Sequence, residues 1–259
     1  MRQRRVTGIE ERLAPYADLI LCGDKAEDFV TARPEASLQF VGGEKDKPTE
    51  SQRLHAAGVM HPRWYQRSSP RYLLPEGFKR VYAEIGCGRG LFINTMAAAD
   101  PEGLYIGIEG CKTFIIRGLE KTRKAGLENA RYIDTFINYA ETAFGEGTLD
   151  GIFLNFSDPW PKDRHAERRL TAPAKAASYY RVLGPGGFVL FKTDGEAFFR
   201  YSLASFTEAG FQIAGAVCDI AATVSEAGIA ERAAVTPTEY ELKFRAQNKS
   251  IYQFTAIPH

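Results

Sequence analysis

Hydrophobic positions over the last two thirds of the chain alternate between strand patterns and helical patterns. Five short apolar runs predict strands at Val81–Ile85, Leu104–Ile108, Arg131–Ile133, Gly151–Phe156 and Gly187–Lys192. Segments with helical spacing follow three of them at Leu91–Ala99, Thr113–Ala125 and Ala172–Val182. A further helix and two further strands are predicted at Ser202–Ala209, Phe211–Val217 and Ile251–Ala256. This alternation is typical of βαβ units, so we predict an α/β fold whose mostly parallel sheet has helices on both faces.

The first 77 residues lack this alternation. Ile9–Ile20 contains Pro15, which predicts a short or broken helix. Residues 34–75 carry two adjacent glycines and five prolines and keep neither a strand nor a helix period. We therefore predict an N-terminal extension over 1–77, with a loop-rich insertion at 34–75, followed by one α/β domain over 78–259.

Composition narrows the class of protein without identifying it. The chain has 259 residues, of which 44% are hydrophobic and 25% charged, which is typical of a globular domain. Its net charge of +1 means that a nucleic-acid surface can come only from local clusters of charge. The four cysteines are too widely scattered for a zinc site, and we expect no metal. No apolar run is long enough to cross a membrane, and Glu10 and Glu11 interrupt any signal peptide, so we expect a cytoplasmic protein.

A glycine-rich turn follows the first predicted strand, where residues 84–90 read E-I-G-C-G-R-G. Glycines at alternate positions permit a sharp turn and let a ligand lie against the backbone. A second acid, Glu109, ends the next strand, where a carboxylate can accept hydrogen bonds from both hydroxyls of a ribose. A tight structural turn and a dinucleotide site remain alternatives, although the dinucleotide fingerprint is G-x-G-x-x-G.

This set resembles the cofactor site of class I methyltransferases, which use S-adenosylmethionine. The resemblance implies that Gly86 and Gly88 line the cofactor and that Glu84 lies near its charged amino-acid end. It also implies an adenine contact after the third strand, for which Asn138 is the candidate. The acid usual at that place is out of register here, since Asp134 and Asn138 flank the expected position. A solvated helix cap is the alternative for Asn138.

The fourth strand leads into a more specific segment, since residues 155–170 read N-F-S-D-P-W-P-K-D-R-H-A-E-R-R-L. Taken alone, it could be a surface turn capped by Asp158. Together with I-G-I-E at 106–109, F-K-T-D at 191–194 and T-E-Y-E at 238–241, it resembles the bacterial tRNA (guanine-N7)-methyltransferase family. The resemblance covers residues 78–257 and implies a Rossmann-like class I fold, with tRNA as partner and a guanine of the variable loop as target. The insertion at 34–75 departs from this family.

The chemistry of guanine N7 limits what the enzyme must do. N7 is already a lone-pair acceptor, so methyl transfer requires positioning rather than a general base. Positive charge moves onto the purine as the bond forms, and a carboxylate stabilises it. We predict that Asp158 has this catalytic role and also accepts hydrogen bonds from guanine N1 and N2.

The family resemblance also implies substrate contacts by Lys162, Asp194, Thr238 and Glu241. Lys162 suits a phosphate, whereas Glu241 suits RNA only if it reads a base edge or orients an arginine or lysine. The alternative for Thr238 and Glu241 is a capping box at the start of an exposed helix. Five basic residues follow Asp158 in the sequence, and a place beside the catalytic residue favours phosphate contact over a merely solvated face: Lys162, Arg164, Arg168, Arg169 and Lys175.

Two more groups of residues can contact RNA in this interpretation. Arginines at positions 2, 4 and 5 form a basic tip, and residues 63–72 interleave aromatic with basic side chains. His165 is assigned a structural or phosphate-contacting role because no proton must move before attack.

Three rival functions stay open at this point. The first is a methyltransferase whose substrate is another RNA, a protein or a small molecule. The second is a non-catalytic RNA-binding protein, and the third is a nicotinamide-dependent oxidoreductase. Oligomeric state is not determined by these patterns.

Overall fold

The computed structural model describes residues 8–21, 72, 74–218 and 228–259. The basic tip, most of the 34–75 insertion and nearly all of the aromatic and basic segment at 63–72 lie outside this part of the chain. The helices are α1 (Ile9–Leu13), α3 (Leu91–Ala99), α4 (Lys112–Ala125), α5 (Pro173–Val182), α6 (Glu196–Glu208), α7 (Ile229–Val235) and α8 (Glu239–Arg245). Short 3-10 helices are η1 (Ala14–Leu19), η4 (Ala140–Thr142) and η5 (Asp163–Arg168).

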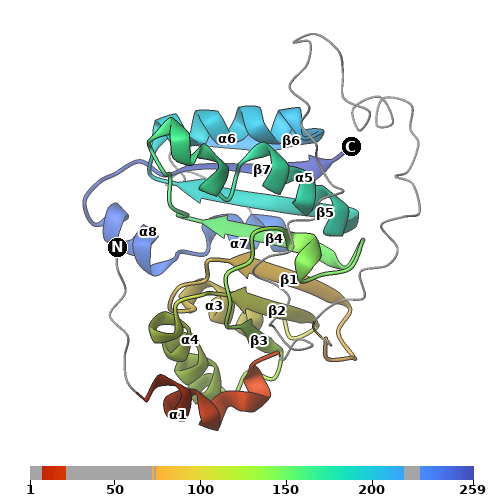
Figure 1. Cartoon of the computed structure of the whole chain (residues 1–259), viewed down its shortest axis with the longest axis vertical. Coiled ribbons are helices and arrows are strands. Elements are labelled where there is room, and N and C mark those ends of the chain that lie inside the picture. The colour runs from red at the N-terminus through yellow and green to blue at the C-terminus, as the bar shows by residue number, and fades with distance from the viewer. Residues whose placement is uncertain (1–7, 22–71, 73, 219–227) are drawn as a thin grey trace.

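A seven-stranded sheet organises the described residues. Its strands are β1 (Arg80–Ile85), β2 (Gly103–Ile108), β3 (Ala130–Ile133), β4 (Leu149–Asn155), β5 (Leu183–Thr193), β6 (Phe211–Cys218) and β7 (Tyr252–Pro258). They lie in the order β3-β2-β1-β4-β5-β7-β6. The first five are parallel, and β7 runs antiparallel to both β5 and β6. The predicted α/β fold is confirmed, and all seven predicted strands are present (Figure 1).

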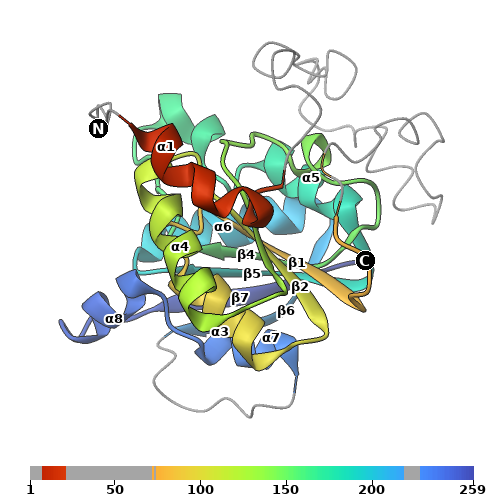
Figure 2. The same cartoon turned by 90° about the horizontal axis from the view of Figure 1, so that it is seen from below.

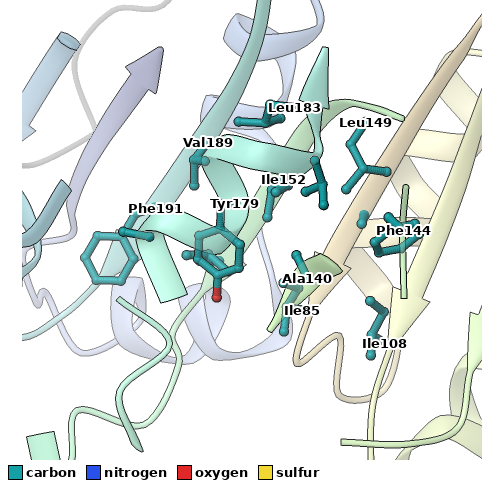
Figure 3. Packing of buried hydrophobic residues seen from close by; sticks show 14 of the residues in the cluster. Ile85, Ile108, Ala140, Phe144, Leu149, Ile152, Tyr179, Leu183, Val189 and Phe191 are labelled. Atoms are coloured by element: carbon teal, nitrogen blue, oxygen red, sulfur yellow. The ribbon is translucent and has the colours of Figure 1, made fainter. Parts of the chain in front are cut away.

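Helices cover both faces of the sheet (Figure 2). Alternate strand residues point to opposite faces, so Ala83 and Ile85 belong to one hydrophobic cluster while Tyr82 belongs to the other. The first cluster packs under η4, α5 and α6, and Figure 3 shows Tyr179 of α5 against Ile152 and Phe191. The second cluster packs under α3, α4 and α7 and includes Phe92, which meets Phe153 edge-on at 5.0 Å between ring centroids. Glu84, which follows Tyr82 by two residues in β1, points to this second face.

The predicted broken helix near the N-terminus is confirmed as α1 followed by η1. Leu13 and Leu19 are buried with the side chains of α3 and α4. Ile20 forms a parallel bridge with Tyr132, and the Leu21 amide donates a 2.8 Å hydrogen bond to the Tyr132 carbonyl. This segment therefore covers the outer edge of β3, where unpaired backbone groups would otherwise face solvent.

Two helices differ from the sequence prediction. α6 begins at Glu196, six residues earlier than predicted, because Phe198, Phe199 and Phe206 are all buried on one helical face. α7 was not predicted at all, since its seven residues are too few to establish a period. α6 packs on β5, β6 and β7, and α7 packs on β5.

Candidate functional site

The sequence-predicted acids meet at the carboxyl-end edge of the parallel strands. Glu84 lies near the end of β1, Glu109 follows β2, Asp158 follows β4 and Asp194 follows β5. The chain order reverses between β1 and β4, which are neighbours in the sheet. Ligands of open α/β sheets bind at such a switch point. The fold therefore collects acids that are up to 110 residues apart along the chain.

The glycine turn between β1 and α3 has two distinct parts. Gly86, Gly88 and Gly90 all have positive φ, at 81°, 55° and 72°. A Cβ at Gly90 would lie 2.8 Å from the Gly118 Cα, so this glycine permits close packing of α3 on α4. A Cβ at Gly86 or Gly88 would meet no described atom within 4 Å. These two glycines therefore leave open space beside the backbone, as a ligand cradle requires.

Glu84 is buried, and its carboxylate is only half satisfied. Its Oε1 accepts a 2.9 Å hydrogen bond from Asn155 Nδ2. Within the described residues, Glu84 Oε2, Asn155 Oδ1 and Ser157 Oγ are buried without a hydrogen-bond partner. Burial raises the pKa of Glu84 to about 8, against the lowering effect of the Asn155 hydrogen bond. A buried acceptor of this kind fits a cationic donor such as the ammonium group of an amino acid.

Glu109 fastens the glycine turn to the loop after β2. Its Oε2 accepts from the Gly88 amide at 3.1 Å and its Oε1 from the Cys111 amide at 2.8 Å. Burial raises the pKa of Glu109, and the charge of Asp158 raises it further. Asp158 and Glu109 therefore act on each other across the edge of the sheet. A carboxylate has about four acceptor positions, so these two hydrogen bonds do not exhaust its capacity to accept from ligand hydroxyls.

The loop after β3 contains the predicted adenine contact. Asn138 is exposed there, and Asp134 forms a 3.7 Å ion pair with Lys112. Phe136 is 73% exposed, and its ring covers Gly110 so closely that a Cβ on that glycine would lie 2.2 Å from it. Sequence reasoning missed Phe136, although an aromatic residue two positions before Asn138 was visible. The adenine contact of Asn138 stays a prediction.

The loop that carries Asp158 is strained and tightly held. Phe156 and Trp160 have positive φ values of 51° and 40°, which are unfavourable for side chains with a Cβ. Arg169 donates from Nε to the Pro159 carbonyl at 2.9 Å and from Nη2 to the Trp160 carbonyl at 3.1 Å. Its guanidinium also lies 4.2 Å from the Tyr201 ring centroid. Backbone strain of this kind persists where the surroundings fix it, and it often marks a functional loop. Asp158 itself is exposed.

The predicted phosphate-binding cluster divides into two groups. Lys162, Arg164 and Arg168 are exposed beside the Asp158 loop. The prediction of phosphate contact is wrong for Arg169 and Lys175, because both side chains are buried and donate to backbone carbonyls. The sequence could not separate the groups because all five residues carry the same charge.

Aromatic contacts hold two of the residues in this region. The Trp160 ring meets His165 edge-on at 5.9 Å between ring centroids. The guanidinium of Arg168 lies 5.2 Å from the Trp160 ring centroid.

The remaining predicted residues lie on the adjoining side of the edge. Asp194 is exposed after β5 and forms a 3.8 Å ion pair with Lys249. Thr238 is the N-cap of α8, and its Oγ1 accepts from the Glu241 amide at 3.0 Å. The capping interaction is thus confirmed, but the expectation that this helix start is exposed was wrong, because Thr238 and Glu241 are both buried.

Glu241 is fully buried between two cations. Its Oε2 accepts from Lys192 Nζ at 3.3 Å, and its Oε1 accepts from Arg245 Nη2 at 2.6 Å. This arrangement corresponds to the role of orienting a lysine or arginine. Lys192 is a residue that sequence reasoning missed, although it stands in the F-K-T-D motif.

Two general features concern the described residues as a whole. No described helix is both long and apolar enough to span a membrane. No three His, Cys, Asp or Glu side chains in the described ranges are grouped so that they could hold a metal ion.

Comparison with known proteins gives consistent matches. A family model described as "Putative methyltransferase" matches residues 79–254. The tRNA (guanine-N(7)-)-methyltransferase of Bacillus licheniformis is 38% identical over 176 residues, which are 68% of this chain and 79% of that protein. The enzyme of the same name from Listeria monocytogenes serotype 4b is 40% identical over the same shares.

Solved structures agree on the fold alone. The crystal structure of a 16S rRNA methyltransferase, KamB, has a TM-score of 0.52 at 15% identity and covers 71% of this chain and 90% of its own. An antibiotic-related methyltransferase has a TM-score of 0.50 at 19% identity and covers 70% of this chain and 90% of its own. At such low identity these likenesses concern the arrangement of the sheet and helices.

Proposed function

The chain belongs to the tRNA (guanine-N(7)-)-methyltransferase family, and from that premise we propose how its own residues carry out the reaction. The enzyme transfers a methyl group from S-adenosylmethionine to N7 of a guanine in tRNA. The target guanine in our proposal lies in the variable loop, and the enzyme acts in the cytoplasm. The observation that carries the proposal is the half-satisfied, buried carboxylate of Glu84 beside the open glycines 86 and 88.

The residues at the ends of β1 and β2 hold the cofactor in this proposal. S-adenosylmethionine, when bound, supplies an electrophilic methyl group on a positively charged sulfur. Gly86 and Gly88 leave room against the backbone, and Glu84 pairs with the cationic amino-acid end. Glu109 accepts from the ribose hydroxyls while it holds the Gly88 amide. Asn138 contacts the adenine ring, on the same loop as exposed Phe136.

Asp158 is the catalytic residue of the proposal. Its carboxylate is exposed on a loop whose backbone is held by Arg169, so it can face a purine without rearrangement. It accepts hydrogen bonds from guanine N1 and N2, which excludes adenine. It also stabilises the positive charge that develops on the ring as N7 is methylated. No general base is required, because N7 offers a lone pair.

The outer rim positions the tRNA. Lys162 is exposed beside the Asp158 loop and contacts a phosphate. Asp194 lies on the neighbouring strand end and contacts the target nucleotide, with Lys249 as its present partner. Thr238 and Glu241 act from within, since Thr238 caps α8 and Glu241 orients Arg245.

Methyl transfer from labelled S-adenosylmethionine to an unmodified tRNA transcript, followed by nucleoside mass analysis, tests the proposal. We expect 7-methylguanosine, and fragment mapping should place it in the variable loop. Asp158→Asn should abolish transfer while the dissociation constant of S-adenosylhomocysteine changes less than about threefold. Loss of cofactor binding in that variant would contradict the role of Asp158 in stabilising the base.

A further inference from the structure

A buried lysine connects the two sides of the proposed site. Glu84, Asn155 and Lys192 stand on the adjacent strands β1, β4 and β5, and Asn155 is the register partner of Lys192. Asn155 donates to Glu84 at 2.9 Å, and the charge of Lys192 acts on Glu84. Lys192 is fully buried, with its Nζ 5.8 Å from the ring centroid of Phe92 in α3. The cofactor side of the site is thus connected to Lys192 through Asn155, which bonds Glu84 and lies beside Lys192 in the sheet.

The other partners of Lys192 belong to the segment that carries the proposed tRNA contacts. Its Nζ donates to the Thr236 carbonyl at 2.8 Å and to Glu241 Oε2 at 3.3 Å. Glu241 in turn holds Arg245, whose side chain is 35% exposed at the end of α8. Acidic and basic side chains therefore alternate from Glu84 through Lys192 and Glu241 to the partly exposed guanidinium of Arg245.

A second connection ties α8 to the glycine turn. Lys121 Nζ donates to the Arg89 carbonyl in the turn at 2.8 Å and to Glu239 at the start of α8 at 2.6 Å. The position of α8 is thus linked to the turn that the cofactor contacts in our proposal. A shift of the glycine turn on cofactor binding would therefore be passed to α8 through Lys121.

Stability alone does not account for a lysine in this place. Removing charges from water costs more than a buried ion pair usually returns, and apolar replacements are often equally stable. Burial lowers the pKa of Lys192 to about 8, which records this cost. Lys192 lies between Glu84, assigned to the cofactor, and Glu241, assigned to the tRNA side, so it is suited to connecting the two.

We propose that Lys192 is a positioning residue that couples occupancy of the cofactor site at Glu84 to the placement of α8 and Arg245, so that cofactor and tRNA bind cooperatively. The inference rests on the proposed function of this edge of the sheet. A cation at Glu84 favours its ionised carboxylate, and this negative charge stabilises the Lys192 cation against Thr236 and Glu241. Arg245 is then held where a tRNA phosphate can meet it. By thermodynamic linkage, tRNA must strengthen cofactor binding by the same factor.

Calorimetry on the full chain tests this coupling without turnover. The dissociation constant of S-adenosylhomocysteine is measured without tRNA and with a saturating unmodified transcript. We expect tRNA to lower it at least fivefold in the wild type, the lower end of typical coupling between sites. In Lys192→Met the ratio should fall to about 1, while each ligand alone still binds.

Two further variants keep the test decisive. Glu241→Gln is nearly isosteric and preserves the Thr238 cap, so it should also bring the ratio to about 1, even if circular dichroism shows that Lys192→Met is unfolded. Lys243→Met removes a positive charge from the exposed side of the same helix and serves as the matched control. It should weaken tRNA binding but keep the fivefold ratio.

The outcomes separate this inference from the proposed function. A wild type that makes 7-methylguanosine but shows a ratio of 1 would overturn the coupling and leave the function intact. A ratio that persists in Glu241→Gln and in folded Lys192→Met, or that vanishes in Lys243→Met, would also overturn it. A wild type that forms no 7-methylguanosine would instead reject the proposed function.

Discussion

Replacing Glu84 by glutamine should stabilise the ligand-free protein and the gain should grow with pH. Glu84 is buried, and burial raises its pKa from 4.5 to about 8. In the unfolded chain the same side chain ionises near its ordinary pKa. Between these two values the folded protein holds one more proton than the unfolded chain, so the free energy of unfolding falls as pH rises. Glutamine has no such proton and keeps an oxygen that can accept from Asn155.

The magnitude follows from the size of the pKa shift. Each pKa unit corresponds to about 1.4 kcal/mol, so a shift of about 3.5 units sets a ceiling of roughly 5 kcal/mol above pH 8. Between about pH 5.5 and 7.5 the stability difference between variant and wild type should grow by roughly 3 kcal/mol. For a chain of this size that is on the order of 6–12 °C in melting temperature.

Thermal melts of both proteins across this pH range measure the effect. Glu128→Gln, in an exposed position before β3, is the control and should follow the wild type at every pH. Glu84→Gln should also bind S-adenosylhomocysteine at least about tenfold more weakly, because the buried acceptor for its ammonium group is neutral. If the difference in melting temperature between Glu84→Gln and the wild type stayed constant across this pH range, the conclusion that Glu84 is protonated in the ligand-free folded protein would be refuted.

Three further predictions concern other parts of the site. Gly90→Ala should lower the free energy of unfolding in urea by about 1–3 kcal/mol more than Gly88→Ala does, because both positions have positive φ but only a Cβ at Gly90 would lie 2.8 Å from Gly118. Gly88→Ala should weaken S-adenosylhomocysteine binding more than Gly90→Ala in calorimetry, and the reverse order would contradict the division of the turn. Glu109→Ala should raise the dissociation constant of S-adenosylhomocysteine about tenfold or more, since the Gly88 and Cys111 amides lose their acceptor; an unchanged constant speaks against the ribose contact. Lys162→Met should reduce the slope of log affinity for tRNA against log salt by about one in filter binding, and an unaltered slope excludes its phosphate contact.

The order of strands and helices could be read from the sequence because each has a local period. Strands such as Val81–Ile85 and helices such as Thr113–Ala125 bury one face or both, and this burial shows as a pattern of hydrophobic residues within a short stretch of sequence. The turn at Gly86 and Gly88 was equally visible, because positive φ at alternate positions requires glycine. α7 was not predicted because seven residues are too few to show a period, and its contacts are with β5 and with the Ala99 carbonyl of α3, which are distant in sequence.

The candidate acids could be found from their positions at strand ends, but their burial, hydrogen-bond partners and pKa values could not be predicted. Glu84 and Glu109 are both glutamates at strand ends, yet Glu84 is buried with an unpartnered oxygen and Glu109 bonds two backbone amides. Likewise, Arg168 is exposed over Trp160 while the next residue, Arg169, is buried beneath the same loop. Burial, partners and pKa are properties of the assembled neighbourhood, so no local pattern contains them.

The sequence by itself determined the α/β class, the glycine turn and the motifs that identify the methyltransferase family, because these depend on residues close together in the chain. The tertiary structure alone decided that Lys192 bonds Glu241 and pairs in register with Asn155, the hydrogen-bond partner of Glu84, since these residues come from β1, β4, β5 and α8. The physical reason is that a buried charge must find its partners in space, and the order of strands in the sheet, not spacing along the chain, determines which partners are within reach.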